Sequence, residues 1–344
     1  MSLPDAFREQ AGHCARLGSA FMAQLLQVLA HEWHEDLPLA AKFAAWEGDI
    51  GPLGASLPLR LAGGLHALVL SGADAKLAAV YPPNAVTNAD LWAQAARAMQ
   101  DHAAFLDQWT DSAPQTNEVR RSAVLIAAGQ ELAAQFAMPM VLSELGASGG
   151  LNLMWDRYAL VIGSGRYGPE APALTLAPTW SGPVPPVAQV HVEARRGVDL
   201  NPLVAHNAED ALRLMAYLWA DQPDRLERTR AAIAVQEAMV DRGDAIEWLE
   251  RRLRPMPGRL HVIYHTIAWQ YFPHDAQARG TALIEAAGAR ATADAPLAWL
   301  SMENDGAGDG AAVTLRIWPG DEMRVLGRAD FHGRWIKWGD VPAP

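Results

Sequence analysis

The stretch Pro139–Leu153, PMVLSELGASGGLNL, joins an apolar run to a glycine-rich segment and then to a second apolar run. This order is typical of the first strand, turn and helix of an open α/β sheet. Gly146 is suited to the positive φ of a tight turn, and Gly150 lets a ligand or a neighbouring chain approach the backbone. With Glu144 at the strand end as a hydrogen-bond acceptor, the stretch predicts the cofactor-binding corner of an α/β domain.

Further along the chain, short apolar runs alternate with amphipathic ones, which is the rhythm of a parallel sheet with crossover helices. We expect strands at 138–144, 189–193, 260–266 and 297–302, and helices at 151–157, 208–219, 245–252 and 277–287. Residues 313–318 and 323–326 flank a Pro-Gly-Asp turn and predict an antiparallel hairpin. The Pro- and Gly-rich residues 163–186 predict a long loop. The fold class is therefore α/β, with a doubly wound, mostly parallel, Rossmann-like sheet.

The part of the chain before this sheet favours helices. Apolar residues recur every three or four positions, as in Phe21, Leu25 and Leu29. We therefore expect a helical domain at 1–137 that caps the substrate side, followed by the sheet domain at 138–344.

Composition limits the kinds of partner. The chain has 344 residues, half of them apolar, and a formal net charge of −11. Nucleic-acid affinity depends on clustered Lys and Arg, so a small-molecule or protein substrate is expected instead. The first residues lack the basic and apolar regions of a secretory signal, and no apolar run is long enough for a membrane span. The single cysteine, Cys14, excludes an intramolecular disulfide and fits a reducing cytoplasm. Oligomeric state is left open.

Metal binding is not expected. His31 and His34 share a helical face, but no further ligand is evident near them, so this pair is interpreted as a solvated helix end.

Acidic residues follow two further predicted elements of the sheet. Asp199, in the string RGVDLNP, is placed where a ribose diol is held in doubly wound sheets, with Glu193 as the alternative if the strand ends earlier. A turn and helix cap explains Asp199 equally well. Asp244 precedes a predicted helix and either caps it or faces an adenine amino group.

A cluster of polar and aromatic residues follows the predicted strand at 260–266. His265 is a candidate general base and Tyr271 a candidate hydrogen-bond donor or stacking surface. A histidine that satisfies a buried backbone group is the alternative interpretation. His332 lies in a predicted turn near the C-terminus.

The letters Gly146-Ala-Ser148-Gly-Gly150 also satisfy G-x-S-x-G, the nucleophile elbow of serine hydrolases. Ser148 would then be the nucleophile, with His332 or His265 as its base. No upstream segment matches the HGGG oxyanion-hole motif, and Glu144 has no role in an elbow.

Taken together, E-x-G-x-x-x-G, G-V-D-x-N-P, G-D-A and the terminal hairpin resemble a class I S-adenosylmethionine-dependent methyltransferase. The strings SELGASGGLNLMWDRY, RRGVDLNPL and HGRW also resemble a bacterial family known as domain of unknown function 2332, over nearly the whole chain. The methyltransferase resemblance implies that S-adenosylmethionine is the cofactor. Its methionine part would contact Glu144, Gly146, Ser148 and Gly150, its ribose Asp199, and its adenine Asp244. A methyltransferase-like enzyme is thus the leading expectation, and a non-catalytic scaffold that kept the fold is a third.

Overall fold

The computed structural model describes residues 1–52 and 54–339. The chain divides into two compact units, one made of Met1–Thr116 and Asn207–Arg230, the other of Asn117–His206 and the chain from Ala231 onward. The segment 117–137, which the sequence grouped with the helical part, thus belongs to the second unit. No helix in the described ranges is both long and apolar enough to span a membrane.

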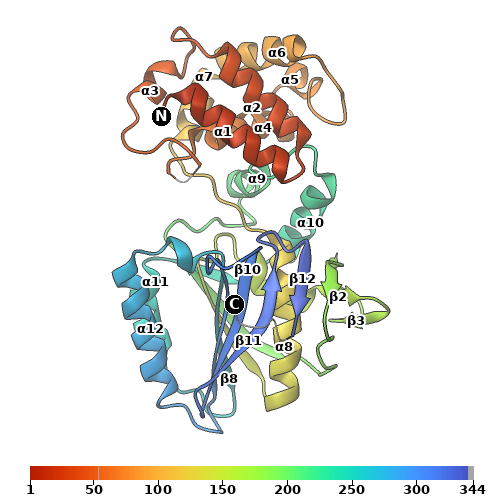
Figure 1. Ribbon diagram of the computed structural model, residues 1–344, viewed down its shortest axis with the longest axis vertical. Helices are drawn as coiled ribbons and strands as arrows, with labels where there is room; N and C mark the ends of the chain where they lie inside the picture. The colour runs from red at the N-terminus through yellow and green to blue at the C-terminus, as the bar shows by residue number, and fades with distance from the viewer. Residues whose placement is uncertain (53, 340–344) are drawn as a thin grey trace. The chain divides into compact units, whose positions relative to one another are not determined.

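The first unit is a group of helices (Figure 1). Their bounds are α1 (Leu3–Arg16), α2 (Ala20–Glu32), α3 (Ala40–Ala44), α4 (Leu57–Leu70), α5 (Ala75–Ala78), α6 (Asn88–Asp101), α7 (Ala103–Thr110) and α9 (Ala208–Ala216), followed by the start of α10 (Pro223–Ala234). The hydroxyl groups of Ser19 and Thr87 cap α2 and α6 by accepting backbone N–H groups, which fixes where these helices begin. Leucines spaced along α2 and α4, such as Leu25, Leu29 and Leu61, are fully buried in the core of this unit.

Helix α9 closes this unit although it lies far along the chain. The backbone carbonyl of Ala216 lies 3.1 Å from Nδ1 of His66 on α4. A Cβ on Gly63 would lie 2.5 Å from the ring of Tyr217, so only glycine allows the ring to pack there.

The second unit is built on a nine-stranded sheet with the order β5-β12-β11-β10-β9-β8-β1-β6-β7. The strands are β1 (Met140–Leu145), β5 (Thr179–Ser181), β6 (Val192–Asp199), β7 (Met239–Arg242), β8 (Leu260–Thr266), β9 (Leu297–Glu303), β10 (Ala311–Trp318), β11 (Glu322–Ala329) and β12 (Trp335–Trp338). Strands β7, β6, β1, β8 and β9 run parallel to one another. Strands β9, β10, β11 and β12 pair antiparallel in succession. A mixed α/β fold with a mostly parallel sheet is thus confirmed.

Helices cover both faces of the sheet. Helices α11 (Ala245–Arg252) and α12 (His274–Gly288) lie on one side and α8 (Ser122–Phe136) on the other (Figure 1). Leu145, Val198 and Ile263 pack into the core on the side of α11 and α12. Every residue of β1 is buried, as expected for a central strand with both faces covered.

Several local predictions needed correction. The strand expected at 189–193 begins at Val192 and ends at Asp199, because the preceding Pro-rich segment stays irregular. The loop expected at 163–186 contains β3 (Gly165–Tyr167), β4 (Thr175–Leu176) and β5. Strands β3 and β4 flank β2 (Ala159–Ile162) in a small second sheet. Strands of two or three residues are too short to produce a periodic sequence signal.

Candidate functional site

The site lies where the strand order changes direction, at the carboxyl end of β1. Strand β6 pairs with one edge of β1 and β8 with the other, both in parallel. The segments that follow these three strands therefore leave the sheet at the same end, the carboxyl end, which is where open α/β sheets bind ligands.

The glycine-rich turn after β1 is tied to the end of β6. The backbone N–H groups of Gly146 and Ala147 both donate to the carbonyl of Val198, at 2.9 and 3.0 Å. The N–H of Ser148 donates to Oδ2 of Asp199 at 2.9 Å. The turn thus directs these amides toward β6.

The amides that follow are also occupied. Gly150 N donates to the carbonyl of Ala147 at 2.7 Å. Leu151 N, which opens the 3₁₀ helix η2 (Leu151–Arg157), donates to Oδ1 of Asn117 at 2.9 Å. A phosphate cradle needs free amides at such a turn, and these amides already have partners within the protein.

Two glycines of the turn are explained by packing. Gly146 and Gly150 both have a φ of +69°, which glycine adopts without the steric cost of a side chain. A Cβ on Gly146 would lie 2.5 Å from Cβ of Ala268, and one on Gly150 would lie 2.7 Å from Nε2 of Gln236. The missing side chains make room for protein atoms.

Glu144 lies in the buried face of β1 directly before this turn. Glu144 is 2% exposed, and its Oε2 has no hydrogen-bond partner among the residues that the structure describes. Burial raises the pKa of Glu144 well above its ordinary value; the negative charge of Asp199 raises it further, and Arg121 opposes both. Burial thus favours the neutral form of this carboxyl group over its ionised form.

Ser148 presents a second unsatisfied group. Its Oγ is buried and has no hydrogen-bond partner in the described parts of the chain, and its φ of +53° is unusual for a residue with a side chain. Of the residues that the sequence placed around the cofactor, Glu144, Gly146, Ser148, Gly150 and Asp199 thus come together at the end of β1 and β6. Buried polar atoms without a partner need an explanation, and a bound ligand is one.

Asp244 is at the end of β7, away from this turn in the sheet order. Its Oδ1 accepts the N–H groups of Ile246 and Glu247 at 2.9 and 3.0 Å. The structure therefore gives it the helix-capping contacts that were one of the two sequence interpretations.

His265, at the end of β8, has both ring nitrogens engaged. Nδ1 lies 2.8 Å from Oε1 of Glu303, and Nε2 lies 2.9 Å from the indole nitrogen of Trp299. An indole N–H can only donate, so Nε2 is the acceptor and Nδ1 carries the proton. The residue is 1% exposed and its ring stacks on Trp269. In this arrangement neither nitrogen is free to receive a proton from a substrate.

Glu303, the last residue of β9, organises the segment after β8, although no sequence motif marks it. Its Oε1 accepts the N–H groups of Ala268 and Trp269 at 3.0 and 3.1 Å, and its Oε2 accepts that of Gln270 at 3.3 Å. Burial would raise the pKa of Glu303, but the hydrogen bonds from His265 and the backbone hold it below its ordinary value. Tyr271, the last residue of η3 (Trp269–Tyr271), is 74% exposed.

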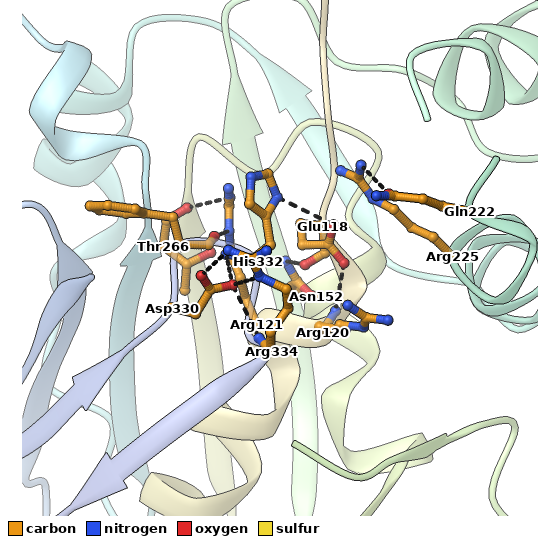
Figure 2. A network of polar contacts seen from close by, with 11 residues as sticks. Glu118, Arg120, Arg121, Asn152, Gln222, Arg225, Thr266, Asp330, His332 and Arg334 are labelled. Carbon is orange, nitrogen blue, oxygen red and sulfur yellow. Dashed lines mark hydrogen bonds and ion pairs between the residues drawn. The ribbon is translucent and has the colours of Figure 1, made fainter. Parts of the chain in front are cut away.

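A second polar cluster borders the end of β8, and Figure 2 draws it. Arg121 of η1 (Val119–Arg121) donates to the carbonyls of Phe331 and Thr266, at 2.9 and 3.0 Å. Glu118 is 2% exposed, and its Oε2 lies 3.7 Å from Nδ1 of His332. The His332 ring makes no other polar contact among the described residues.

The other contacts of this cluster hold two segments in place, the one around Glu118 and the one between Asp330 and Arg334. Nδ2 of Asn152 donates to the backbone carbonyl of Glu118 at 3.3 Å, and Asn152 Oδ1 accepts from Oγ of Ser122 at 2.7 Å. Asp330 accepts the guanidinium of Arg334 through both carboxylate oxygens, at 2.9 and 2.7 Å. Glu118, Arg121 and Asn152 carry no recognisable motif, so only the fold brings them beside the end of β8.

The fold and the site define a mixed α/β protein whose mostly parallel sheet has buried, unsatisfied polar atoms, Glu144 Oε2 and Ser148 Oγ, at its switch point. The sequence model of one family, described as uncharacterised protein conserved in bacteria (DUF2332), matches residues 4–338. The chain therefore belongs to this family, as its sequence strings indicated. No curated protein matches the sequence.

Proposed function

We propose that the protein is an S-adenosylmethionine-dependent methyltransferase that acts on a small-molecule or protein acceptor. The observation that carries this proposal is a pair of buried polar atoms without a hydrogen-bond partner among the described residues: Glu144 Oε2 near the end of the central strand β1, and Ser148 Oγ on the turn that follows it. Both belong to the sequence segment that resembles the methyltransferase cofactor motif.

The residues of the turn suit this cofactor better than a dinucleotide. A dinucleotide needs free amides for its pyrophosphate, whereas those of Gly146, Ala147 and Ser148 are occupied. A ligand ammonium group beside Glu144 would give Oε2 a partner and favour its ionised form. Asp199 accepts the backbone N–H groups of Ser148 and Asn201, one on each carboxylate oxygen, and a carboxylate oxygen can accept more than one hydrogen bond, including one from a ribose hydroxyl.

When bound, S-adenosylmethionine supplies the sulfonium methyl group for transfer. The protein's part is to hold the acceptor in line with that methyl group and to accept a proton where one must leave. His265 is a positioning residue in this proposal, because its contact with Glu303 shapes the segment that ends at Tyr271. His332 has the ring that is free of hydrogen bonds among the described residues, so it is the better candidate for the base.

The test is thermal unfolding with and without ligand. Millimolar S-adenosylmethionine, or its demethylated product, should raise the Tm of the wild type, because a ligand that binds only the folded state stabilises it. Asp199→Asn should reduce or abolish the shift, since it removes the carboxylate and keeps one acceptor for the turn. Glu193→Gln, at the opposite end of the same strand, is the matched control and should leave the shift unchanged.

Absence of any shift in the wild type with either compound would contradict the proposal. If the ligand raised the Tm of the wild type and of Asp199→Asn equally, the ligand would have to bind elsewhere than at this turn. The Tm without ligand reports separately whether the variant turn is damaged.

One observation favours a serine hydrolase as a second candidate. Ser148 has a positive φ, as expected for the strained turn of a nucleophile elbow. Its Oγ has no histidine partner, however, which a nucleophile requires. Covalent labelling of Ser148 by a fluorophosphonate probe would support the hydrolase. A scaffold without a ligand would give neither labelling nor a thermal shift.

A further inference from the structure

A groove lies along helix α11 at the edge of the large sheet. It has a volume of about 420 Å³, within the usual range for small-molecule sites. Its walls come from β6, the edge strand β7 and α11. The lining residues are Arg196, Asp241, Arg242, Trp248, Arg251 and Arg252.

The acidic residue of the groove is already committed to one arginine. Asp241 accepts Nε and Nη2 of Arg196 at 2.7 and 2.8 Å, a bidentate pair. It also accepts the indole N–H of Trp248 at 2.7 Å. Asp241 is the one carboxylate in the lining, and it is paired with Arg196. Arg242, Arg251 and Arg252 therefore have no carboxylate partner among the lining residues.

Arg252 is held in the groove by neutral groups. Its Nε donates to Oγ of Ser143 at 3.0 Å, and its guanidinium lies 5.4 Å from the ring centroid of Trp248. Burial lowers the pKa of Arg252 and the charge of Arg196 lowers it further, while Asp241 has the opposite effect. The side chain is thus a partly buried cation fixed in place before any ligand arrives.

The other two arginines are exposed and can reach an incoming ligand. Arg242 donates to the carbonyl of Leu200 and to Oδ1 of Asn201, both of which are neutral. Arg251 lies in the last turn of α11 and has no hydrogen-bond or ion-pair partner within the described residues. This excess of positive charge occurs in a chain whose net charge is −11.

We propose that this groove binds a compact dianion, namely phosphate or the phosphate group of a small monoester. Guanidinium groups match the geometry of phosphate oxygens, and several of them converge on one cavity of small-molecule size. A nucleic acid is disfavoured because the acidic chain as a whole repels a polyanion. The residues that line this groove come from β6, β7 and α11, and none of them belongs to the turn after β1.

The test is calorimetric titration of the full chain with inorganic phosphate and with phenyl phosphate. Sodium chloride at the same ionic strength separates specific binding from screening. Both phosphate compounds should bind. Citrate, a polycarboxylate, and a short single-stranded oligonucleotide, a polyanion, are titrated as alternative ligands. Tighter binding of citrate or of the oligonucleotide than of phenyl phosphate would overturn the assignment, as would no heat beyond the chloride baseline.

Variants locate the binding. Arg242→Gln combined with Arg251→Gln should weaken phosphate binding by about tenfold or more, since hydrogen bonds to charged groups are lost. The control combines Arg279→Gln on α12 with Arg290→Gln just after the end of that helix. Both positions are exposed, and the double variant changes the net charge equally, so it should have no such effect. If both double variants weakened phosphate binding equally, the net charge of the protein would explain the effect, and the proposal would be overturned. Circular dichroism verifies that each variant folds. If a variant does not fold, the titration of the wild type with phosphate still tests the proposal.

Discussion

Glu144 can be tested as a single residue because its raised pKa has a definite consequence for stability. A group whose pKa is higher in the folded state stabilises the fold when protonated, and that stabilisation is lost as the pH rises above 4.5 toward the folded pKa. Glu144→Gln keeps the shape and cannot ionise. Thermal unfolding from pH 4.5 to 8 should therefore give this variant a Tm equal to the wild type at the acidic end and equal or higher at pH 8.

The control is Glu250→Gln, an exposed residue of α11, which should change the Tm little across this range. A marked loss of Tm in Glu144→Gln at pH 8 would instead mean that an ionised carboxylate at this position has a partner in the fold.

At the scale of elements, the segment after β8 depends on Glu303 of β9. Replacing Glu303 by Gln removes a charged acceptor of several backbone N–H groups and should cost about 1.5–3 kcal/mol, on the order of 5 °C in Tm. A lowered pKa stabilises the fold above the unfolded value and loses that effect as the pH falls below 4.5. The Tm difference from the wild type should therefore be largest near pH 7 and shrink below pH 4.5.

Melting curves at both pH values check this, with Glu322→Gln on β11 as the control. Glu322 is exposed and forms a surface ion pair with Arg324, so its loss should be nearly neutral at every pH. A Tm difference that stays constant with pH would mean that the carboxylate charge of Glu303 is not what holds the segment.

Some elements of the second unit were predictable from sequence and others were not. Strand β1 can be predicted from the sequence because a strand that is buried on both faces is mostly apolar. The glycines that follow it, which local packing requires, mark its end. Strand β5 gives no such signal, since it is short and is placed by pairing with distant β12. The same holds within the site. Glu144 and Asp199 lie at the carboxyl ends of β1 and β6, whereas Glu303, at the end of β9, contacts the segment after β8 because the sheet order places these two strands side by side.

At the scale of the whole molecule, the helical unit is discontinuous in sequence. Residues 207–230 supply α9, and without it Gly63, His66 and the Trp109 region lose packing against Ala216 and Tyr217. We expect a fragment of residues 1–116 to be clearly less stable than the same fragment joined by a flexible linker to 207–230. Near-ultraviolet circular dichroism and urea titration compare the two, and equal midpoints would contradict the expectation.

The discontinuity of the helical unit also has a consequence for biosynthesis. Residues 1–116 leave the ribosome first, but α9 follows only after 117–206 have been made. At roughly 5–20 residues per second, the early helices wait on the order of ten seconds for the segment that covers Gly63 and its neighbours. During that interval the apolar surface meant for α9 is open to chaperones, so translation speed through the intervening segment becomes a determinant of folding yield.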